Sequence, residues 1–183
     1  MADITYVRLA QVDVFLAVVM DAFSRRIVGW ALAPKITTEL TPTALGNAIA
    51  SRQPQPGLIR HSDRGAQYAS NAYVDMPIQH GMIPSMSRPG SPYDNAKCER
   101  FMKTLKLEEI RCREYRNIED LRTNIDAFID RYYNATRLHS ALGYLSPEEF
   151  ERSAAQPPSA ELPKAPRVSF SRHTEIYPSD VRT

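Results

Sequence analysis

The sequence predicts an α/β fold in which helices cover both faces of a mixed five-stranded sheet. Three strand-like segments open the chain, two more alternate with helical segments, and further helical segments follow. The second and third strand-like segments, VFLAVVM and IVGWALA, are continuously apolar, so both faces of the sheet that they form must be covered. Short links join the first three segments, which favours an antiparallel arrangement for them.

The predicted strands combine β-branched and aromatic residues with alternating or continuous apolar character. In chain order they cover residues 4–9, 14–20, 27–33, 58–63 and 82–87. The fourth strand ends in the polar residues HSD, and open α/β sheets bind their ligands at such strand ends. Functional side chains are therefore expected beside residue 63.

The predicted helices each have an apolar face or a recognisable end. The first starts at Thr41–Pro42, because proline suits the first helical turn. The second covers residues 70–81 and the third residues 95–114. The fourth covers residues 118–133, and its apolar residues recur at helical spacing. The residues of this stripe, which we expect to face the core, are Ile118, Leu121, Ile125, Phe128, Ile129 and Tyr132.

Length and composition limit the classes of function. With 183 residues, the chain is long enough for one domain with a sizeable core. The net charge is only +2, so an argument for a nucleic-acid partner must rest on where the charges lie. The two cysteines form no CxxC pair and are poorly placed for a zinc site. No apolar run reaches the roughly 18 residues of a membrane helix and no signal peptide opens the chain, so we expect no membrane contact and a cytoplasmic location.

The composition changes near residue 153. The final segment holds five prolines and has no clear hydrophobic period, which is typical of a segment with little fixed structure. We therefore divide the chain into a core, residues 1–152, and a Pro-rich tail, residues 153–183.

Three acidic residues lie where the predicted fold can bring them together. Asp3 is on the first strand, Asp63 ends the fourth strand, and Glu99 is near the start of the third helix, with 35 residues between Asp63 and Glu99. Each has a simpler interpretation when taken alone. Asp3 can be a solvated residue near a chain end, Asp63 can form a turn, and Glu99 can pair with Lys103 one helical turn later.

Carboxylates that converge repel one another, by about 4 kcal/mol per pair at 4 Å and an effective dielectric constant near 20. Proteins keep such clusters to bind divalent cations, and ligands that are all oxygen favour Mg²⁺ or Mn²⁺. Two such ions about 3.5 to 4 Å apart activate an attacking oxygen and stabilise the leaving oxygen at phosphorus. The chemistry that needs all three acids is therefore phosphodiester hydrolysis or strand transfer.

Five blocks of the sequence carry a family resemblance. They are DITYV, DAFSRRIVGWAL, HSDRGAQYAS, SMSRPGSPYDNAKCERFMKTLKLE and YYNATRLHSALGYLSPEEF. In this order they resemble the integrase catalytic core of bacterial insertion-sequence transposases of the DDE, IS-three type, which are related to retroviral integrases. The resemblance covers about residues 2–151.

The resemblance implies an RNase H-like fold in which Asp3, Asp63 and Glu99 are the catalytic triad and bind two Mg²⁺ or Mn²⁺ ions. It implies cleavage of DNA at transposon ends and joining of a 3′-hydroxyl to a target phosphodiester, with water or the DNA 3′-hydroxyl as nucleophile and no covalent enzyme intermediate. The implied partners are DNA, at the transposon ends and at the target, and further copies of the chain assembled on it. Such a protein is associated with the bacterial nucleoid when it is bound to DNA.

Basic and polar residues beside the triad are candidate DNA contacts. Lys103 and Lys106 follow Glu99 at i+4 and i+7 and so share its helix face, although a solvated helix face is the simpler interpretation. The residues that flank Asp63 and that we expect to touch DNA or to serve a local structural role are His61, Arg64 and Gln67.

One departure from the family pattern shapes the remaining expectations. Family members carry an N-terminal helical DNA-binding region, whereas Asp3 stands almost at the start of this sequence. We therefore expect a central strand that lacks part of its length, and a separately encoded N-terminal helical DNA-binding protein as a partner. The alternative function is a catalytically silent transposase remnant that only binds nucleic acid or partner subunits. The last of the five blocks, YYNATRLHSALGYLSPEEF, argues against a third interpretation, a simple RNase H-like nuclease.

Overall fold

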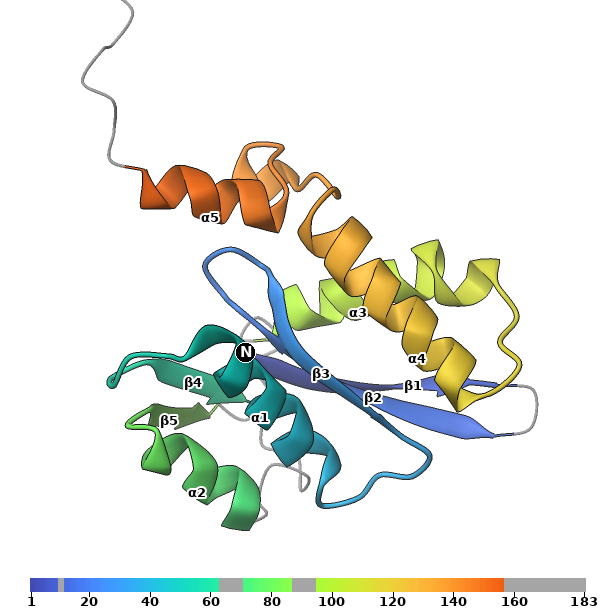
Figure 1. The fold of residues 1–183 in the computed structure, drawn as a ribbon, viewed down its shortest axis with the longest axis horizontal. Coiled ribbons are helices and arrows are strands. Elements are labelled where there is room, and N and C mark those ends of the chain that lie inside the picture. Colours follow the sequence, from blue (N-terminus) through green and yellow to red (C-terminus); the bar gives the residue numbers. More distant parts are fainter. Residues whose placement is uncertain (10–11, 63–70, 87–94, 157–183) are drawn as a thin grey trace, which may run out of the picture.

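The computed structural model describes residues 1–9, 12–62, 71–86 and 95–156, and Figure 1 shows how their helices and strands are arranged. All five predicted strands are present, each within two residues of its expected range. They are β1 (Ala2–Arg8), β2 (Asp13–Met20), β3 (Ile27–Ala33), β4 (Ile59–Ser62) and β5 (Ile83–Met86). β1, β2 and β3 form an antiparallel sheet in that order, as predicted.

The prediction of one five-stranded sheet is wrong in its pairing. In the part of the chain that the structure describes, β4 and β5 pair with each other in parallel and form a second sheet of two strands. β4 approaches β1 without a hydrogen-bonded ladder between them. The described parts of β4 and β5 are four residues long, and each ends where the described residues break off. β1 itself pairs with β2 at each of its seven residues.

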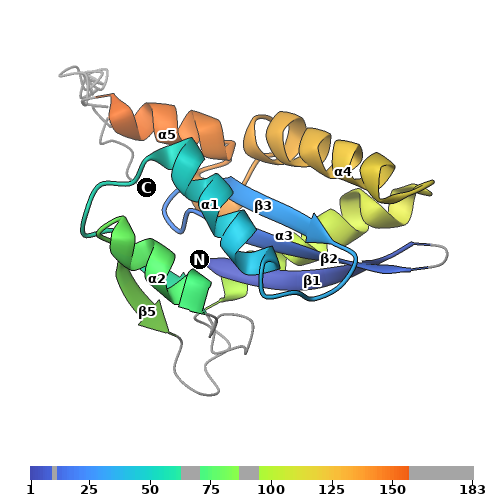
Figure 2. The same cartoon turned by 60° about the horizontal axis from the view of Figure 1, so that its bottom comes forward.

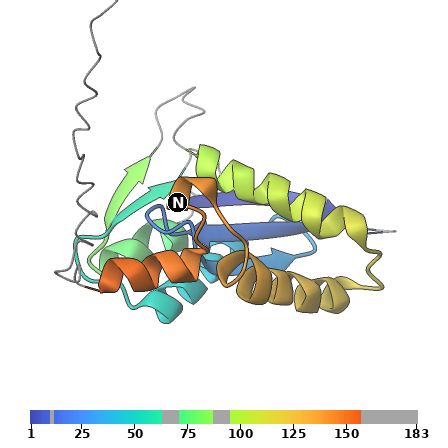
Figure 3. The ribbon, with the colours of Figure 1, turned by 90° about the horizontal axis from the view of Figure 1, so that it is seen from above.

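Helices cover both faces of the three-stranded sheet, as predicted. The helical elements are α1 (Leu40–Arg52), α2 (Asn71–Gln79), α3 (Ala96–Glu108), the 3₁₀ turn η3 (Ile110–Cys112), α4 (Ile118–Ala127), the π-helix η4 (Phe128–Asn134), the 3₁₀ turn η5 (Ser140–Leu142) and α5 (Pro147–Ala155). α3 and α4 bury their apolar residues against one face, and α1 packs on the other. Figure 3 shows α3 and α1 on opposite sides of the sheet.

The alternation of side chains along β2 explains this two-sided core. Val14, Leu16 and Val18 face the larger cluster, which includes the apolar residues of α3 and α4. Ala17, between them in sequence, faces the smaller cluster formed with α1. Because successive strand residues point to opposite faces, a continuously apolar strand supports a core on each side.

The end of the fourth helix differs from the prediction. Tyr132, which we expected in the core, is 41% exposed, whereas Tyr133 and Asn134 are buried. The segment from Phe128 onward is a π-helix, whose i→i+5 hydrogen bonds put more residues into each turn. The inward-facing position therefore shifts past Tyr132, and the Asn134 side chain exchanges two hydrogen bonds of 2.9 Å with the backbone of Ile27.

The last described helix, α5, crosses the expected domain boundary at residue 152. Ser146 begins the helix with a capping box to Glu149, and Pro147 occupies the first turn. Figure 2 shows α5 beside the carboxyl-terminal end of α1. The division into a core and a Pro-rich tail stays a prediction, because residues 157–183 lie outside the described residues. Among the described helices, none is long and apolar enough to cross a membrane.

Candidate functional site

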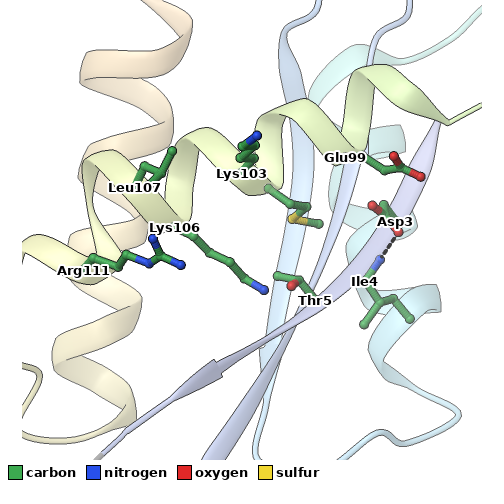
Figure 4. A pocket seen from close by; sticks show the side chains of 9 residues that line it. Asp3, Ile4, Thr5, Glu99, Lys103, Lys106, Leu107 and Arg111 are labelled. Carbon is green, nitrogen blue, oxygen red and sulfur yellow. Dashed lines mark hydrogen bonds between the residues drawn. The ribbon is translucent and has the colours of Figure 1, made fainter.

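A groove of about 320 Å³ runs between β1 and α3. Figure 4 shows it from close by, with two carboxylates at one end and basic side chains along the rest. The residues that line the groove are Asp3, Ile4, Thr5, Glu99, Met102, Lys103, Lys106, Leu107 and Arg111. This groove brings together acidic and basic residues that the sequence predicts for the site.

The two carboxylates reach the groove from elements far apart in sequence. Asp3 is the second residue of β1, and its Oδ1 accepts a 2.9 Å hydrogen bond from the backbone N–H of Ile4. Glu99 is in the first turn of α3 and is exposed. Figure 4 shows both carboxylates directed into the same space. The packing of α3 on the sheet therefore converts two distant acids into neighbours.

The burial of α3 explains why Glu99 faces outward. Cys98, Phe101, Met102 and Leu105 are the buried residues of this helix. They lie on the side that packs on the sheet, which leaves the residues of the other side for the groove. Phe101 and Leu105 on the packed side are 1% and 0% exposed.

Electrostatics at Cys98 reflects the two nearby acids. Burial, together with the smaller effect of the Asp3 and Glu99 charges and against the opposing amino terminus, raises the pKa of the Cys98 thiol to about 12. The thiol is fully buried in the core and is not among the residues that line the groove. The ionisable ligands at this end of the groove are then carboxylate oxygens, which fit a hard divalent cation such as Mg²⁺ or Mn²⁺.

The third predicted ligand, Asp63, lies outside the described residues. Among the described residues, no group of three His, Cys, Asp or Glu side chains forms a metal site. The structure thus brings together two of the three predicted acids, Asp3 and Glu99.

Both predicted lysines line the same groove. Lys106 lies with its ammonium nitrogen 4.9 Å from the centre of the Tyr6 ring, a cation–π contact that holds the side chain across the groove. The alternative interpretation of Glu99 as the ion-pair partner of Lys103 is not supported, because no ion pair joins them in the described structure.

Of the predicted contacts around Asp63, the structure describes only His61, which does not line this groove. His61 is on β4, where its Nδ1 lies 3.1 Å from the hydroxyl oxygen of Ser85, and it lines a separate cavity of about 730 Å³. Arg64 and Gln67 lie outside the described residues. The roles of these three residues in DNA binding stay predictions.

Sequence reasoning missed Thr5, Tyr6 and Arg111. Strand alternation could have predicted Thr5, because it lies two residues after Asp3 and so points to the same face of β1. Tyr6 is 55% exposed, and its contact with Lys106 depends on how α3 lies over β1. The position of Arg111 could not be predicted from the sequence, because α3 ends at Glu108, earlier than predicted. Arg111 then lies in the 3₁₀ turn η3.

Comparison with known proteins adds relatives to this geometry. The chain matches the integrase core domain over residues 1–92 and again over residues 80–147. It is 41% identical over 152 residues to a transposase for insertion sequence element IS904 from Lactococcus lactis, a match that covers 83% of this chain and 60% of the relative. The chain therefore spans about 60% of the length of that relative.

Solved structures of retroviral integrases share the fold. One neighbour is a simian T-cell lymphotropic virus intasome in complex with the PP2A regulatory subunit B56 gamma, with a TM-score of 0.67 and 18% identity over 93% of this chain and 59% of that chain. Another is the HTLV-2 integrase catalytic core domain in complex with magnesium, with a TM-score of 0.59 and 15% identity over 81% of this chain and 92% of that chain. The predicted RNase H-like α/β fold is confirmed.

Proposed function

Because this chain belongs to the integrase core domain family, we propose that it is the catalytic core of an insertion-sequence transposase, which cleaves and joins DNA strands in a metal-dependent reaction. The observation that carries the proposal is the groove between β1 and α3. It joins the carboxylates of Asp3 and Glu99 to a basic track, and this combination suits a phosphodiester held beside divalent cations. The similarity to a transposase from Lactococcus lactis supports the same reaction class.

Asp3, Asp63 and Glu99 are the proposed metal ligands. The oxygen donors of Asp3 and Glu99 fit Mg²⁺ or Mn²⁺, and a neighbouring fold is an integrase core in complex with magnesium. When bound, two such ions supply an activated oxygen nucleophile and stabilise the leaving oxygen. The residues of this chain fix the ligand positions: the backbone N–H of Ile4 orients the Asp3 carboxylate, and the packed face of α3 aims Glu99 at it.

Lys103 and Lys106 are the proposed phosphate contacts next to the acids. Both line the groove beyond Glu99, so a DNA backbone whose reacting phosphate meets the acids also meets these ammonium groups. The Tyr6 ring on β1 contacts the Lys106 ammonium group and orients it. The substrate is DNA at transposon ends and at a target, and the nucleophile is water or a DNA 3′-hydroxyl.

An assembly of several copies on DNA is part of the proposal. It draws support from a neighbour described as an intasome and from HTLV-2 integrase cores described in trimeric and dimeric forms. A separately encoded N-terminal helical DNA-binding protein stays a predicted partner.

A strand-joining assay tests the proposed function. Purified protein is mixed with oligonucleotides that carry the inverted repeats flanking the gene, in Mn²⁺ or Mg²⁺, and joined products are separated by size. Glu99→Gln removes one charged ligand with little change in size, and we expect it to reduce joining by at least about a hundredfold. Glu114→Gln is the matched control, because Glu114 is exposed and outside the groove.

The result that would overturn the proposal is joining that survives Glu99→Gln, or joining that is as fast with EDTA as with metal. A protein that binds these oligonucleotides and never joins them would instead identify a catalytically silent remnant.

A further inference from the structure

The groove continues past the two predicted lysines to a third cation. Lys103, Lys106 and Arg111 follow Glu99 along the same wall, and Figure 4 shows Arg111 at the end far from the carboxylates. At about 1.5 Å of rise per helical residue, the row from Glu99 to Arg111 is roughly 18 Å long. Arg111 is therefore too far from Glu99 to touch the reacting phosphate.

These three cations have no acidic partner in the described structure, in contrast to the arginines around them. Arg113 pairs with Glu109 at 3.2 Å, and Arg137 pairs with Glu108 at 2.8 Å. No carboxylate of the described residues lies within ion-pair distance of Lys103, Lys106 or Arg111. The positive charge of the groove is therefore available to an anionic ligand.

A break in the helix places Arg111 in this row. In an unbroken α-helix Arg111 would lie about 120° around the axis from Glu99, off the groove face. Instead α3 ends at Glu108, and the backbone N–H of Cys112 donates a 3.1 Å hydrogen bond to the carbonyl of Glu109 in the 3₁₀ turn. Tyr115 steadies this turn, since its hydroxyl lies 3.1 Å from the Glu109 carboxylate.

We propose that Arg111 is a DNA-phosphate contact at the far end of the groove, and that one DNA strand lies along α3 from the carboxylates to Arg111. This inference rests on the proposed function. Successive phosphates of one strand are several ångströms apart along its backbone, so a row of roughly 18 Å extends past the reacting phosphate to further ones on the same strand. Arg111 therefore meets a phosphate beyond the reacting one, where its planar guanidinium can bind two phosphate oxygens at once.

The salt dependence of DNA binding tests this assignment. The equilibrium constant for a duplex of arbitrary sequence is measured by fluorescence anisotropy at several KCl concentrations, because phosphate contacts release counterions whatever the sequence. Arg111→Ala is expected to weaken binding roughly fivefold at low salt and to lower the slope of log K against log salt by about one. The double variant Lys106→Ala, Arg111→Ala is expected to lower the slope by about two, because the residues meet different phosphates.

Arg113→Ala is the matched control, since it removes an arginine of the same segment that Glu109 already neutralises. We expect it to leave the slope within about 0.3 of the parent value. Arg111→Ala with an unchanged slope would overturn the inference, as would an equal loss in Arg113→Ala.

Strand joining separates this inference from the proposed function. If the parent chain joins strands in a Glu99-dependent manner while Arg111→Ala keeps the parent slope, only the assignment of Arg111 fails. If the parent chain neither joins strands nor binds DNA, both proposals fail. Far-ultraviolet circular dichroism of each variant confirms that the exposed substitution leaves the fold intact.

Discussion

At the scale of single residues, His139 is a buried side chain whose protonation the fold opposes. It is 6% exposed, and its ring meets the ring of Tyr133 edge-on at a centroid distance of 5.0 Å. Burial lowers the pKa of His139 to about 4, and the positive charges of Arg137 and Arg25 act in the same direction. The folded protein therefore holds this ring neutral at pH values where an unfolded chain binds a proton.

This shift predicts a loss of stability in mild acid. The unfolded chain binds a proton at His139 near pH 6.5, whereas the folded chain does so near pH 4. The stability of the fold that depends on a neutral His139 is therefore fully present above pH 6.5, and it is lost as the pH falls toward 4. Urea unfolding of the parent and of His139→Leu at pH 7 and pH 4.5 measures it. The parent is expected to lose more stability than His139→Leu over this interval.

His80→Leu provides the comparison, because His80 is exposed. It is expected to keep the full acid sensitivity of the parent. Equal losses of stability in the parent and in His139→Leu would contradict the role assigned to His139.

At the scale of elements, the approach of α1 to β3 depends on a residue without a side chain. A Cβ at Gly29 would lie 2.5 Å from the backbone nitrogen of Ala48 and closer still to the carbonyl oxygen of Ala44. Neither backbone atom can move aside without shifting the helix. The sequence IVGWALA predicts the strand, but the need for glycine at its centre follows from how closely α1 packs on it.

Gly29→Ala is expected to destabilise the protein by about 1 to 3 kcal/mol or more, because the added methyl overpacks a backbone contact. Gly46→Ala is the matched change on α1 itself, where the nearest atoms to the new Cβ are those of Met76 at 4.0 Å. It is expected to raise stability by about 0.5 to 1 kcal/mol, since alanine favours a helix interior. Denaturant unfolding of both variants checks the pair, and similar effects from the two would refute this account of the contact.

At the scale of the whole molecule, Glu151 on α5 joins segments from both halves of the chain. Its carboxylate accepts a 2.6 Å hydrogen bond from the hydroxyl of Ser24 and pairs with Arg26 at 3.3 Å and with Arg52 at the end of α1. Arg52 also contacts Asp21 at 3.1 Å. The last described helix is thus tied to the turn between β2 and β3 and to α1, as the neighbouring positions of α5 and α1 in Figure 2 show.

Glu151→Ala is expected to lower the free energy of unfolding by about 1 to 2 kcal/mol, because several partly buried partners lose their acceptor together. Hydrogen exchange is expected to become faster in α5 and to change little in α3. Arg152→Ala is the control on the same helix, since Arg152 is exposed and forms no ion pair among the described residues. Unchanged exchange in α5 of Glu151→Ala would show that apolar packing alone holds the helix.

The order of strands and helices could be predicted from the sequence, because hydrophobic period and turn residues are local properties. The same local reasoning placed Lys103 and Lys106 on the face of Glu99, since helical geometry fixes which residues share a face. It failed at Tyr132, because the π-helix changed the period from Phe128 onward. It also failed in the pairing of β4, because strand pairing is a long-range property and in the described structure β4 pairs with β5 and not with β1.

The sequence by itself determined the types and the local faces of the side chains in the candidate site: two acids, two lysines and the apolar residues that orient α3. Only the tertiary structure decided that Asp3 and Glu99 share one groove, that His61 lines another cavity, and that Arg111 ends the basic row. The physical reason is that helical and strand periods act over a few residues. The groove exists because the apolar face of α3 packs across the sheet and a 3₁₀ turn ends that helix where it does.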